Sequence, residues 1–393
     1  MSLPIVLFDD TYRINLLPLV YTKPVALLRV GITTIKEKWE YFAEVAGFLT
    51  IDYLSVKYHR NMAGDVLYVN GAVIPSEDLF AAIGSLKEGQ ALVQDDIIIA
   101  CLLPGFKREM TISDFKETIQ YNNEIDVIKN VWDIFSLNGK IIKSDFELLT
   151  QGRKSLPIPA TVNVLSPQNI FIEEGAELNF VTINANDGPV YIGKNAKILE
   201  GSVVKGPMAL CEDSVIKMGA KIYGETTIGP HCKVGGEVMN AVLQAYSNKG
   251  HDGYLGNSVL GEWCNLGADT NTSNLKNNYA KVKLWNYNNE CFVNTGLQFC
   301  GLIMGDHSKS GINTMFNTGT LVGVSANIFG GGFPRNFIPS YAWGGSGGFM
   351  VYKFEKALET ARIVMERRGI QPDDAEVEIL QQIFKQTENY RRF

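Results

Sequence analysis

The sequence predicts three parts: an α/β region, a parallel β-helix built from hexapeptide repeats, and a helical tail. The β-helix is predicted by eight apolar residues at an unbroken spacing of six. A period of six suits neither an α-helix, which repeats every 3.6 residues, nor a simple strand, which repeats every two. It suits a coil in which each six residues form one short side, with one aliphatic side chain pointing inward. These residues are Ile192, Ile198, Val204, Leu210, Ile216, Ile222, Ile228 and Val234.

Residues 1–155 mix helix and strand signals, so we expect one α/β domain there. A helical pattern covers 33–45, and two prolines within 156–159 indicate a linker. Three short apolar runs are typical of buried strands. They are residues 4–8, 66–69 and 97–103.

Residues 156–345 are predicted to form the β-helix domain. The first register ends near Val234, and 240–253 interrupts it, with 247–253 read as a loop. Loops that interrupt a solenoid often carry function. Beyond the interruption the period resumes in a shifted phase, with Ser310 as a polar exception. The resumed apolar positions are Leu260, Leu266, Met304, Phe316, Val322 and Ile328.

Residues 346–393 are predicted to form a helical tail. Helical periodicity covers 349–368 and 374–390, and Gly369 is a plausible stop between the two helices. We expect these helices to cap the last coil and to shield its open edge.

Composition excludes several classes of function. The 393 residues carry a net charge of −6 with no basic block, which argues against nucleic acid or a membrane surface as partner. The start lacks a signal-peptide pattern, and no apolar run is long enough to span a bilayer. Six cysteines without a CxxC pair predict free thiols and a cytoplasmic protein. The four histidines show no metal-ligand spacing, so no metal site is expected.

The sharpest motif lies at the interruption of the repeat. His251 stands between Gly250 and Gly253, and Tyr254 follows. A histidine on a glycine-flanked loop is exposed, and it can take a proton from an amine near neutral pH. Glu237 could hold the imidazole tautomer and stabilise its cation. The residues therefore favour base catalysis at this loop.

This motif resembles the acetyltransferase half of the bifunctional glucosamine-1-phosphate acetyltransferase / N-acetylglucosamine-1-phosphate uridyltransferase family. The family has a Glu and, fourteen residues later, a His in a Gly-His-x-x-Tyr-x-Gly-Asp context, as at Glu237 and His251, with Asn257 in place of the Asp. An Asn-Ile-Gly-Ala-Gly-Thr segment follows in the family and matches 265–268, with Asp269 replacing the Gly. The resemblance implies that His251 is the base and Glu237 its carboxylate partner. It also implies that Tyr254 and Asn265 contact the sugar phosphate, and that Ala268 and Asn274 lie near the acetyl-CoA thioester.

The sequence departs from the family's pattern in three places, and the third concerns the phosphate of the substrate. Met239 replaces a basic residue of the family, and Leu275 replaces a Tyr. The family's phosphate-binding Arg has no counterpart at the matching spacing. Lys217 is the nearest match, and Lys221 or Lys233 could also reach. A Lys gives only a point charge, where Arg forms two parallel hydrogen bonds.

The N-terminal part resembles a shortened sugar-phosphate nucleotidyltransferase whose chemistry is eroded. Arg13, followed by the segment 17–28 with Lys23, matches the family's Thr-Arg-Leu-x-Pro-Leu-Thr and Pro-Lys-Pro-Leu-Leu stretches, and 132–138 matches its hinge helix. The glycine-rich loop that admits nucleotide phosphates is replaced by Asp9-Asp10-Thr11-Tyr12. The metal-binding Asn-Gly-Asp reads Asn70-Gly71-Ala72, so Mg²⁺ is expected only if nucleotidyl transfer is retained. Arg13, Lys23 and Asn70 are thus interpreted as remnants of a nucleotide site.

Over nearly its full length the chain is also similar to bacterial proteins described as fused sugar nucleotidyltransferases, with 249–285 and 330–334 as hallmarks. The resemblances together imply a left-handed β-helix, a homotrimer, and acetyl transfer from acetyl-CoA to an amino-sugar phosphate, glucosamine 1-phosphate, in UDP-N-acetylglucosamine synthesis. Two alternatives stay open. One is a nucleotidyltransferase that forms UDP- or dTDP-sugars, and the other is a non-catalytic protein that binds sugar nucleotides.

Overall fold

The computed structural model describes residues 4–59, 66–105, 107–109 and 111–393. Contacts within the chain divide it into two compact units, which are described separately below. The first holds Met1–Leu16, Thr22–Leu28 and Thr33–Asn130, and the second holds Leu17–Tyr21, Arg29–Ile32 and Val131–Phe393.

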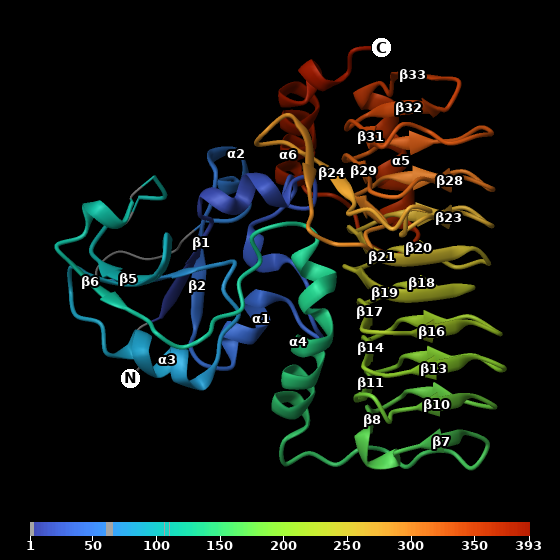
Figure 1. Ribbon diagram of the computed structural model, residues 1–393, viewed down its shortest axis with the longest axis horizontal. Helices are drawn as coiled ribbons and strands as arrows, with labels where there is room; N and C mark the ends of the chain where they lie inside the picture. The colour runs from blue at the N-terminus through green and yellow to red at the C-terminus, as the bar shows by residue number, and fades with distance from the viewer. Residues whose placement is uncertain (1–3, 60–65, 106, 110) are drawn as a thin grey trace. The chain divides into compact units, whose positions relative to one another are not determined.

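The first unit is built on a six-stranded mixed sheet in the order β2-β1-β3-β5-β4-β6 (Figure 1). β1 is parallel to both β2 and β3, β5 is antiparallel to β3 and β4, and β6 is parallel to β4. The strands are β1 (Ile5–Phe8), β2 (Val45–Leu49), β3 (Val66–Asn70), β4 (Gln90–Gln94), β5 (Ile97–Leu103) and β6 (Glu117–Gln120). The helices are α1 (Ile35–Glu40), α2 (Asp52–Ser55) and α3 (Glu77–Gly84), with 3-10 turns η1 (Thr11–Leu16), η2 (Val25–Leu27) and η3 (Ile112–Asp114).

The three strands expected in this unit are confirmed to within one residue as β1, β3 and β5. The helix expected over 33–45 is too long, because α1 covers only Ile35–Glu40. Thr34 caps it in a reciprocal capping box with Glu37, which fixes its start. Its pattern fails at the far end because Val45 pairs with Ile5 at the edge of the sheet, and this pairing overrides the local periodicity.

The second unit is a parallel β-helix in which strands of successive coils pair in register (Figure 1). The sides of the coils form a 13-stranded and a 10-stranded sheet, with two smaller pairs. The larger sheet contains β7 (Asn163–Leu165), β8 (Ile170–Ile172), β10 (Thr182–Asn184), β11 (Val190–Ile192), β13 (Val203–Lys205), β14 (Met208–Leu210), β16 (Lys221–Tyr223), β17 (Thr226–Ile228), β19 (Glu237–Leu243), β21 (Tyr254–Leu260), β26 (Leu302–Met304), β29 (Thr320–Val322) and β31 (Phe337–Ile338). The smaller contains β9 (Glu177–Leu178), β12 (Lys197–Ile198), β15 (Val215–Ile216), β18 (Lys233–Val234), β20 (Asn248–Lys249), β22 (Asn265–Leu266), β27 (Lys309–Ser310), β30 (Asn327–Ile328), β32 (Ala342–Gly345) and β33 (Gly348–Val351). β23 (Asn271–Thr272) pairs with β28 (Met315–Phe316), and β24 (Lys283–Asn286) pairs with β25 (Cys291–Asn294).

The hexapeptide prediction is confirmed. All eight repeat residues lie inside the coil and are at most 1% exposed. Ile192 pairs with Leu210, eighteen residues on, and Leu210 pairs with Ile228. Three inward residues per coil therefore stack on their equivalents, and the core is a column of aliphatic side chains.

The expected break of the register within 240–253 is confirmed, but the loop expected over 247–253 is too long, because Asn248–Lys249 forms β20 and the coil continues. Asn248 and Lys249 form β20 and pair with Lys233 and Val234 of β18. What changes is the length of the coil: Ile228 pairs with Leu243, only fifteen residues on. The shorter coil shifts the position of the inward residues along the sequence. Because the polar Lys249 occupies one of these inward positions, a search for apolar residues at a spacing of six does not detect the repeat here.

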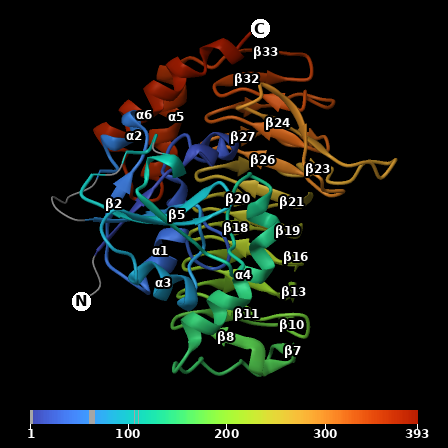
Figure 2. The same cartoon turned by 60° about the vertical axis from the view of Figure 1, so that its left-hand side comes forward.

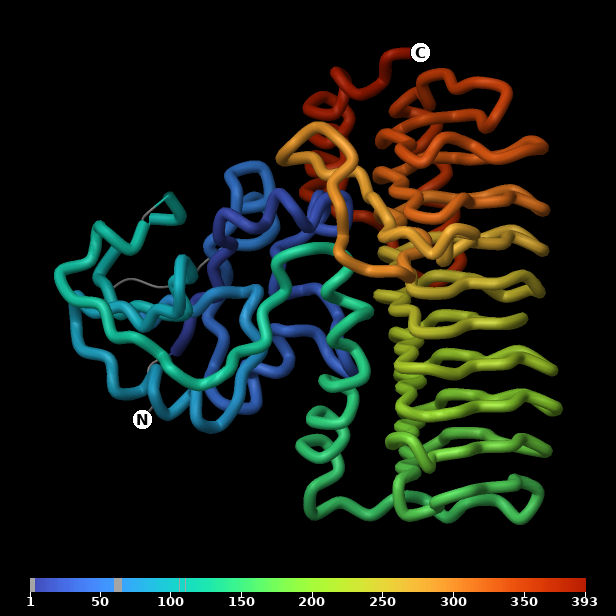
Figure 3. Tube along the Cα trace, in the orientation of Figure 1, coloured from blue at the N-terminus to red at the C-terminus, as the bar shows by residue number. Residues whose placement is uncertain are grey.

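The later repeat positions are confirmed. Leu260, Leu266, Met304, Phe316, Val322 and Ile328 are all buried. Ser310 occupies an inward place, where its hydroxyl lies 3.0 Å from the Thr270 hydroxyl. Between β23 and β26 the chain leaves the coil through the β24–β25 hairpin and returns, as the trace in Figure 3 shows.

The helices of this unit lie against the sides of the coil. They are α4 (Asp133–Thr150), α5 (Phe354–Glu366) and α6 (Asp374–Gln386), with 3-10 turns η4 (Pro167–Asn169) and η5 (Glu388–Tyr390). Ile142 of α4 packs on Ala209 of β14. The first tail helix begins later than expected, because Gly348–Val351 forms β33, which pairs antiparallel with β32 and covers the sheet edge.

The tail helices, side by side in Figure 2, run along the coil instead of only capping its end. The Tyr341 hydroxyl donates to the Leu380 carbonyl near the last coil, whereas Arg368 reaches Asn248 several coils earlier. None of the helices in the described part of the chain combines the length and the apolar composition that crossing a bilayer requires.

The stacked column makes a testable prediction about stability. Ile216→Ala should lower the free energy of unfolding by about 2–4 kcal/mol, because it leaves a cavity between two coils. Val203→Ala, at an outward position that is 49% exposed, should change it by less than about 0.5 kcal/mol. Urea unfolding followed by circular dichroism measures both, and equal effects would contradict the inward stacking.

Candidate functional site

The outer face of the 10-stranded sheet carries a cavity of about 750 Å³. Its floor is a column of outward side chains, because the register places Lys233, Asn248, Asn265 and Lys309 next to one another on β18, β20, β22 and β27. Neighbouring strands are spaced by about 4.8 Å, so the column spans about 14 Å. Polar side chains thus repeat along a face whose inward positions are mostly apolar.

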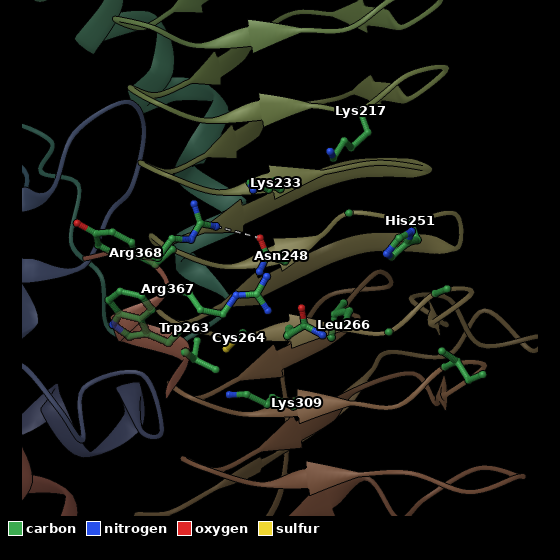
Figure 4. A pocket seen from close by; sticks show the side chains of 17 residues that line it. Lys217, Lys233, Asn248, His251, Trp263, Cys264, Leu266, Lys309, Arg367 and Arg368 are labelled. Atoms are coloured by element: carbon green, nitrogen blue, oxygen red, sulfur yellow. Dashed lines mark hydrogen bonds between the residues drawn. The ribbon is translucent and has the colours of Figure 1, made fainter. Parts of the chain in front are cut away.

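The end of α5 covers this column (Figure 4). Arg367 and Arg368 extend over the strands, and the Arg368 Nη2 lies 3.4 Å from the Asn248 Oδ1 as donor. Lys309 Nζ donates to the His307 carbonyl at 2.9 Å, and burial lowers the pKa of Lys309 to about 8. Burial also lowers the pKa of Lys233, and the neighbouring Arg368 lowers it further. The cavity is therefore strongly cationic.

A ladder of stacked rings forms a further wall. His231, Tyr246, Trp263 and His307 occupy the same corner of successive coils, with ring centroids 4.7, 4.2 and 6.3 Å apart. All four have positive φ angles of 55–63°, as this corner requires. Tyr246 and Trp263 line the cavity, but their ring faces are covered by neighbours in the ladder. The two rings therefore present only their edges to the cavity, and their faces are not available for a ligand to stack on.

His251 lies at the corner between β20 and β21, where it is exposed. It lines the large cavity and also a second hollow of about 320 Å³. Gly253 closes the corner with φ of 110°, where a Cβ would stand 2.2 Å from the Thr270 carbonyl oxygen. Only glycine fits there. The imidazole is thus presented by a tightly fixed backbone to two adjoining spaces.

Lys249 holds this corner from inside the coil. It is 1% exposed, and its ammonium donates to the His251 carbonyl at 2.5 Å. Burial lowers its pKa to about 8, and the carboxylates of Asp252 and Asp269 oppose part of that shift. Its side chain occupies a position where most other coils have an aliphatic side chain. The lysine packs less well in the core, but it forms a hydrogen bond to the backbone of the His251 corner.

The structure separates the residues expected at the site into two groups on either side of this corner. Five line the large cavity. Of the remaining four, three begin β16, β19 and β21 in the middle of the 13-stranded sheet, and the fourth lies two residues after β23. The cavity group is Lys217, Lys233, His251, Asn265 and Ala268, and the strand group is Lys221, Glu237, Tyr254 and Asn274.

Three members of the strand group, Glu237, Tyr254 and Asn274, form side-chain hydrogen bonds. The Glu237 carboxylate accepts from the Tyr223 hydroxyl at 2.6 Å, which raises the pKa of Tyr223 to about 12. Asn274 Nδ2 donates to the Tyr254 hydroxyl and to Asn257 Oδ1, at 3.0 and 2.7 Å. Burial is the main cause of the raised pKa of Tyr254. Among the hydrogen bonds of the described residues, none joins Glu237 to the His251 imidazole, although the Glu237 N–H donates to the Gly253 carbonyl at 3.2 Å.

The nucleotide-site remnants are engaged within the first unit. Arg13 pairs with Asp9 at 3.1 Å, and both side chains are buried. Asn70 donates to Asp10 at 2.7 Å and accepts from the Ala72 N–H at 2.9 Å. Lys23 is buried as well.

A hollow of about 380 Å³ in this unit is lined by other residues, including Asp10, Tyr12, Asp96 and Arg108. Within the described ranges, no three His, Cys, Asp or Glu side chains group as a metal site. Ala72 offers no ligand, and burial raises the pKa of Asp10. The metal-binding carboxylate of the family that the sequence resembles therefore has no counterpart at position 72.

Four cavity residues were missed in the sequence. Arg367 and Arg368 read only as the end of a helix, more than 100 residues from the motif. Lys309 and Asn248 lie in strands whose outward positions carry no periodic signal. Since outward residues of a β-helix are brought together by register alone, only the correct coil length could have revealed the column.

Comparison with known proteins adds a family for the first part of the chain. Residues 5–154 match the family model described as sugar nucleotidyl transferase. The chain is 24% identical to the bifunctional protein GlmU of Synechococcus elongatus over 252 residues, covering 58% of this chain and 51% of that protein. It is 31% identical over 223 residues to a bifunctional sugar-1-phosphate nucleotidylyltransferase/acetyltransferase of Sulfurisphaera tokodaii, covering 51% and 55%. The resemblance to the bifunctional family is thus confirmed.

The chain spans about half the length of these curated relatives. Among solved structures, a UDP-N-acetylglucosamine acyltransferase from Campylobacter jejuni aligns with 58% of this chain and 83% of its own, at 17% identity. Its TM-score of 0.28 is too low to carry an inference.

Lys249 yields a prediction in which stability and pH are linked. Lys249→Met should raise the free energy of unfolding at pH 7 by up to about 3 kcal/mol, because an apolar side chain replaces a buried charge. The folded-state pKa of about 8 lies below the ordinary 10.5, so the cost of the charge is complete below pH 8. The gain should therefore shrink as pH rises from 8 toward 10.5.

Urea unfolding across this pH range measures the effect. The control is Lys221→Met at an exposed position, which should leave the free energy of unfolding unchanged at every pH. A Lys249→Met protein less stable than the wild type at pH 7 would contradict the reading of a costly buried ammonium.

Proposed function

We propose that the chain is a CoA-dependent N-acetyltransferase that acts on a phosphorylated amino sugar in UDP-N-acetylglucosamine synthesis. Acetyl-CoA is the donor and glucosamine 1-phosphate is the acceptor expected from the sequence. The observation that carries the proposal is the place of His251, at the junction of a cationic cavity and a second hollow. Acetyl transfer needs two substrates to meet at one base, and the names of the relatives include acetyltransferases.

In this mechanism His251 accepts the proton that the acceptor amine loses. The amine nitrogen forms a bond to the thioester carbonyl carbon, and the carbon–sulfur bond then breaks. The CoA thiolate leaves and takes up a proton, which the His251 imidazolium can return. Asn265 contacts the acceptor in the cavity, and Ala268, which lines both spaces, lies beside the thioester.

Glu237 acts on His251 through the electrostatic field and not through a hydrogen bond. Its carboxylate is held by Tyr223, and its backbone is joined to the corner at Gly253. A fixed negative charge nearby stabilises the imidazolium that forms during transfer. Tyr254 and Asn274 order the same strands, since their side chains bond to each other.

We also propose a homotrimer in the cytoplasm. Apolar side chains stand exposed on several coils, as at Phe180, Met218 and Ile312, which are 66–69% exposed, and exposed apolar surface favours association. The six cysteines are free thiols, as a reducing compartment requires.

The first test is CoA release from acetyl-CoA with glucosamine 1-phosphate. His251→Ala should lower kcat by about 10²–10⁴, which is the usual contribution of a general base. His59→Ala, an exposed histidine of the first unit, serves as the control and should keep the wild-type rate. A His251→Ala enzyme with wild-type kcat would refute the assignment of the base.

Nucleotidyl transfer by the first unit is a second candidate, favoured by the family match over residues 5–154. We rank it second because Arg13 and Asn70 are bonded internally and Ala72 replaces the metal-binding carboxylate. Exchange of labelled pyrophosphate into UTP, measured with Mg²⁺ and N-acetylglucosamine 1-phosphate, should stay at background. Exchange that Arg13→Ala abolishes would reverse the ranking.

A further inference from the structure

The cavity beneath α5 has a lining of unusual charge. Among the residues that the structure describes, five cationic side chains line it, from the coil and from the tail, and no Asp or Glu side chain does. Figure 4 shows them surrounding one space. They are Lys217, Lys233, Lys309, Arg367 and Arg368.

These charges are not neutralised by neighbouring carboxylates. In the described part of the chain, no ion pair joins any of the five to an Asp or Glu. Burial and the arginines lower the pKa of Lys233, as expected where cations crowd together. Holding such a cluster costs free energy, and a bound anion would recover it.

The distance from the clustered charges to His251 limits what that anion can be. Arg368 is anchored at Asn248, the first residue of β20, and His251 follows three residues later at the corner beyond that strand. Three residues of extended chain span at most about 10 Å. A sugar ring with a phosphate or diphosphate arm bridges such an interval, with its amine at the imidazole. The pantetheine arm of CoA would carry its own phosphates well past it.

We propose that Arg367 and Arg368, together with Lys233, clamp the phosphate arm of the acceptor while its amine lies at His251. This inference rests on the proposed acetyl transfer and deepens it. The two arginines supply the planar, two-pronged phosphate contact that the repeat itself lacks, since its own cations here are lysines. The phosphate site is thus completed by the tail of the chain.

The shared chemistry is a phosphate ester on an amino sugar, and two sources carry it. A sugar 1-phosphate would occupy the part of the cavity near Asn248. A nucleoside diphosphate-linked sugar would extend farther along the column, toward Lys309. The volume of about 750 Å³ admits either.

The test compares acceptor kinetics of the wild type with those of Arg367→Ala and Arg368→Ala. Each variant should raise KM for the phosphorylated acceptor about 10- to 100-fold, because a charge-assisted contact is lost. KM for acetyl-CoA should stay within about twofold of the wild type. The matched control is Arg362→Ala, an exposed arginine on the same helix that does not line the cavity.

Three acceptors separate the sources: unphosphorylated glucosamine, glucosamine 1-phosphate and UDP-linked glucosamine. The penalty of the arginine variants should vanish for glucosamine and remain for whichever phosphorylated form is used. Lys309→Ala should add a penalty only for the UDP-linked sugar. A raised KM for acetyl-CoA, or an equal penalty on unphosphorylated glucosamine, would overturn the clamp.

A binding measurement separates failure of the clamp from failure of the proposed function. Calorimetry with glucosamine 1-phosphate and with UDP-linked glucosamine needs no turnover. If no acceptor is acetylated but the arginine variants bind the phosphorylated sugar at least 10-fold more weakly, the function fails and the clamp stands. Wild-type affinity in both variants would overturn the clamp whatever the turnover.

Discussion

One inward side chain per short strand, stacked on its equivalent in the next coil, is the constraint on which the rest of the second unit depends. Ile198, Ile216 and Val234 form such a column and are at most 1% exposed. Because every coil is tied to its neighbours through these contacts, outward residues fall into columns too. The candidate site follows from those columns, because residues far apart in sequence become neighbours at the spacing of adjacent strands.

The same constraint explains why the site lies where the coil changes length. A fifteen-residue coil between Ile228 and Leu243 shifts the corners of the coils above it, and the next corner presents His251. A lysine in the core then binds the backbone of that corner, although an aliphatic residue would pack better. A buried lysine in this column breaks a local rule of the fold, and such exceptions often mark functional sites. The end of α5 covers the cationic side chains beside the His251 corner.

Much of the fold could be predicted, and less of the site. The aliphatic period locates the β-helix from Ile192 to Val234 because burial acts on every sixth residue, and it recovers the later coils from Leu260 onward. It fails at Lys249, where the inward residue is polar. Of the candidate site, the sequence indicates the corner at His251, because glycine corners are visible in sequence. Arg367 and Arg368 could not be predicted, because no local sequence pattern indicates that the tail packs against β20. The separation of Glu237 from the imidazole was equally hidden, because it depends on which side of a corner each side chain lies.

The most direct measurement is a crystal structure of the protein with a phosphorylated amino sugar bound. We expect the amine within hydrogen-bond distance of the His251 imidazole and the phosphate between Arg367, Arg368 and the outer face of β18 and β20. A sugar phosphate bound instead against Glu237 and Tyr254, or in the hollow of the first unit beside Asp10, would contradict the central claim that the cationic cavity and the His251 corner form one site.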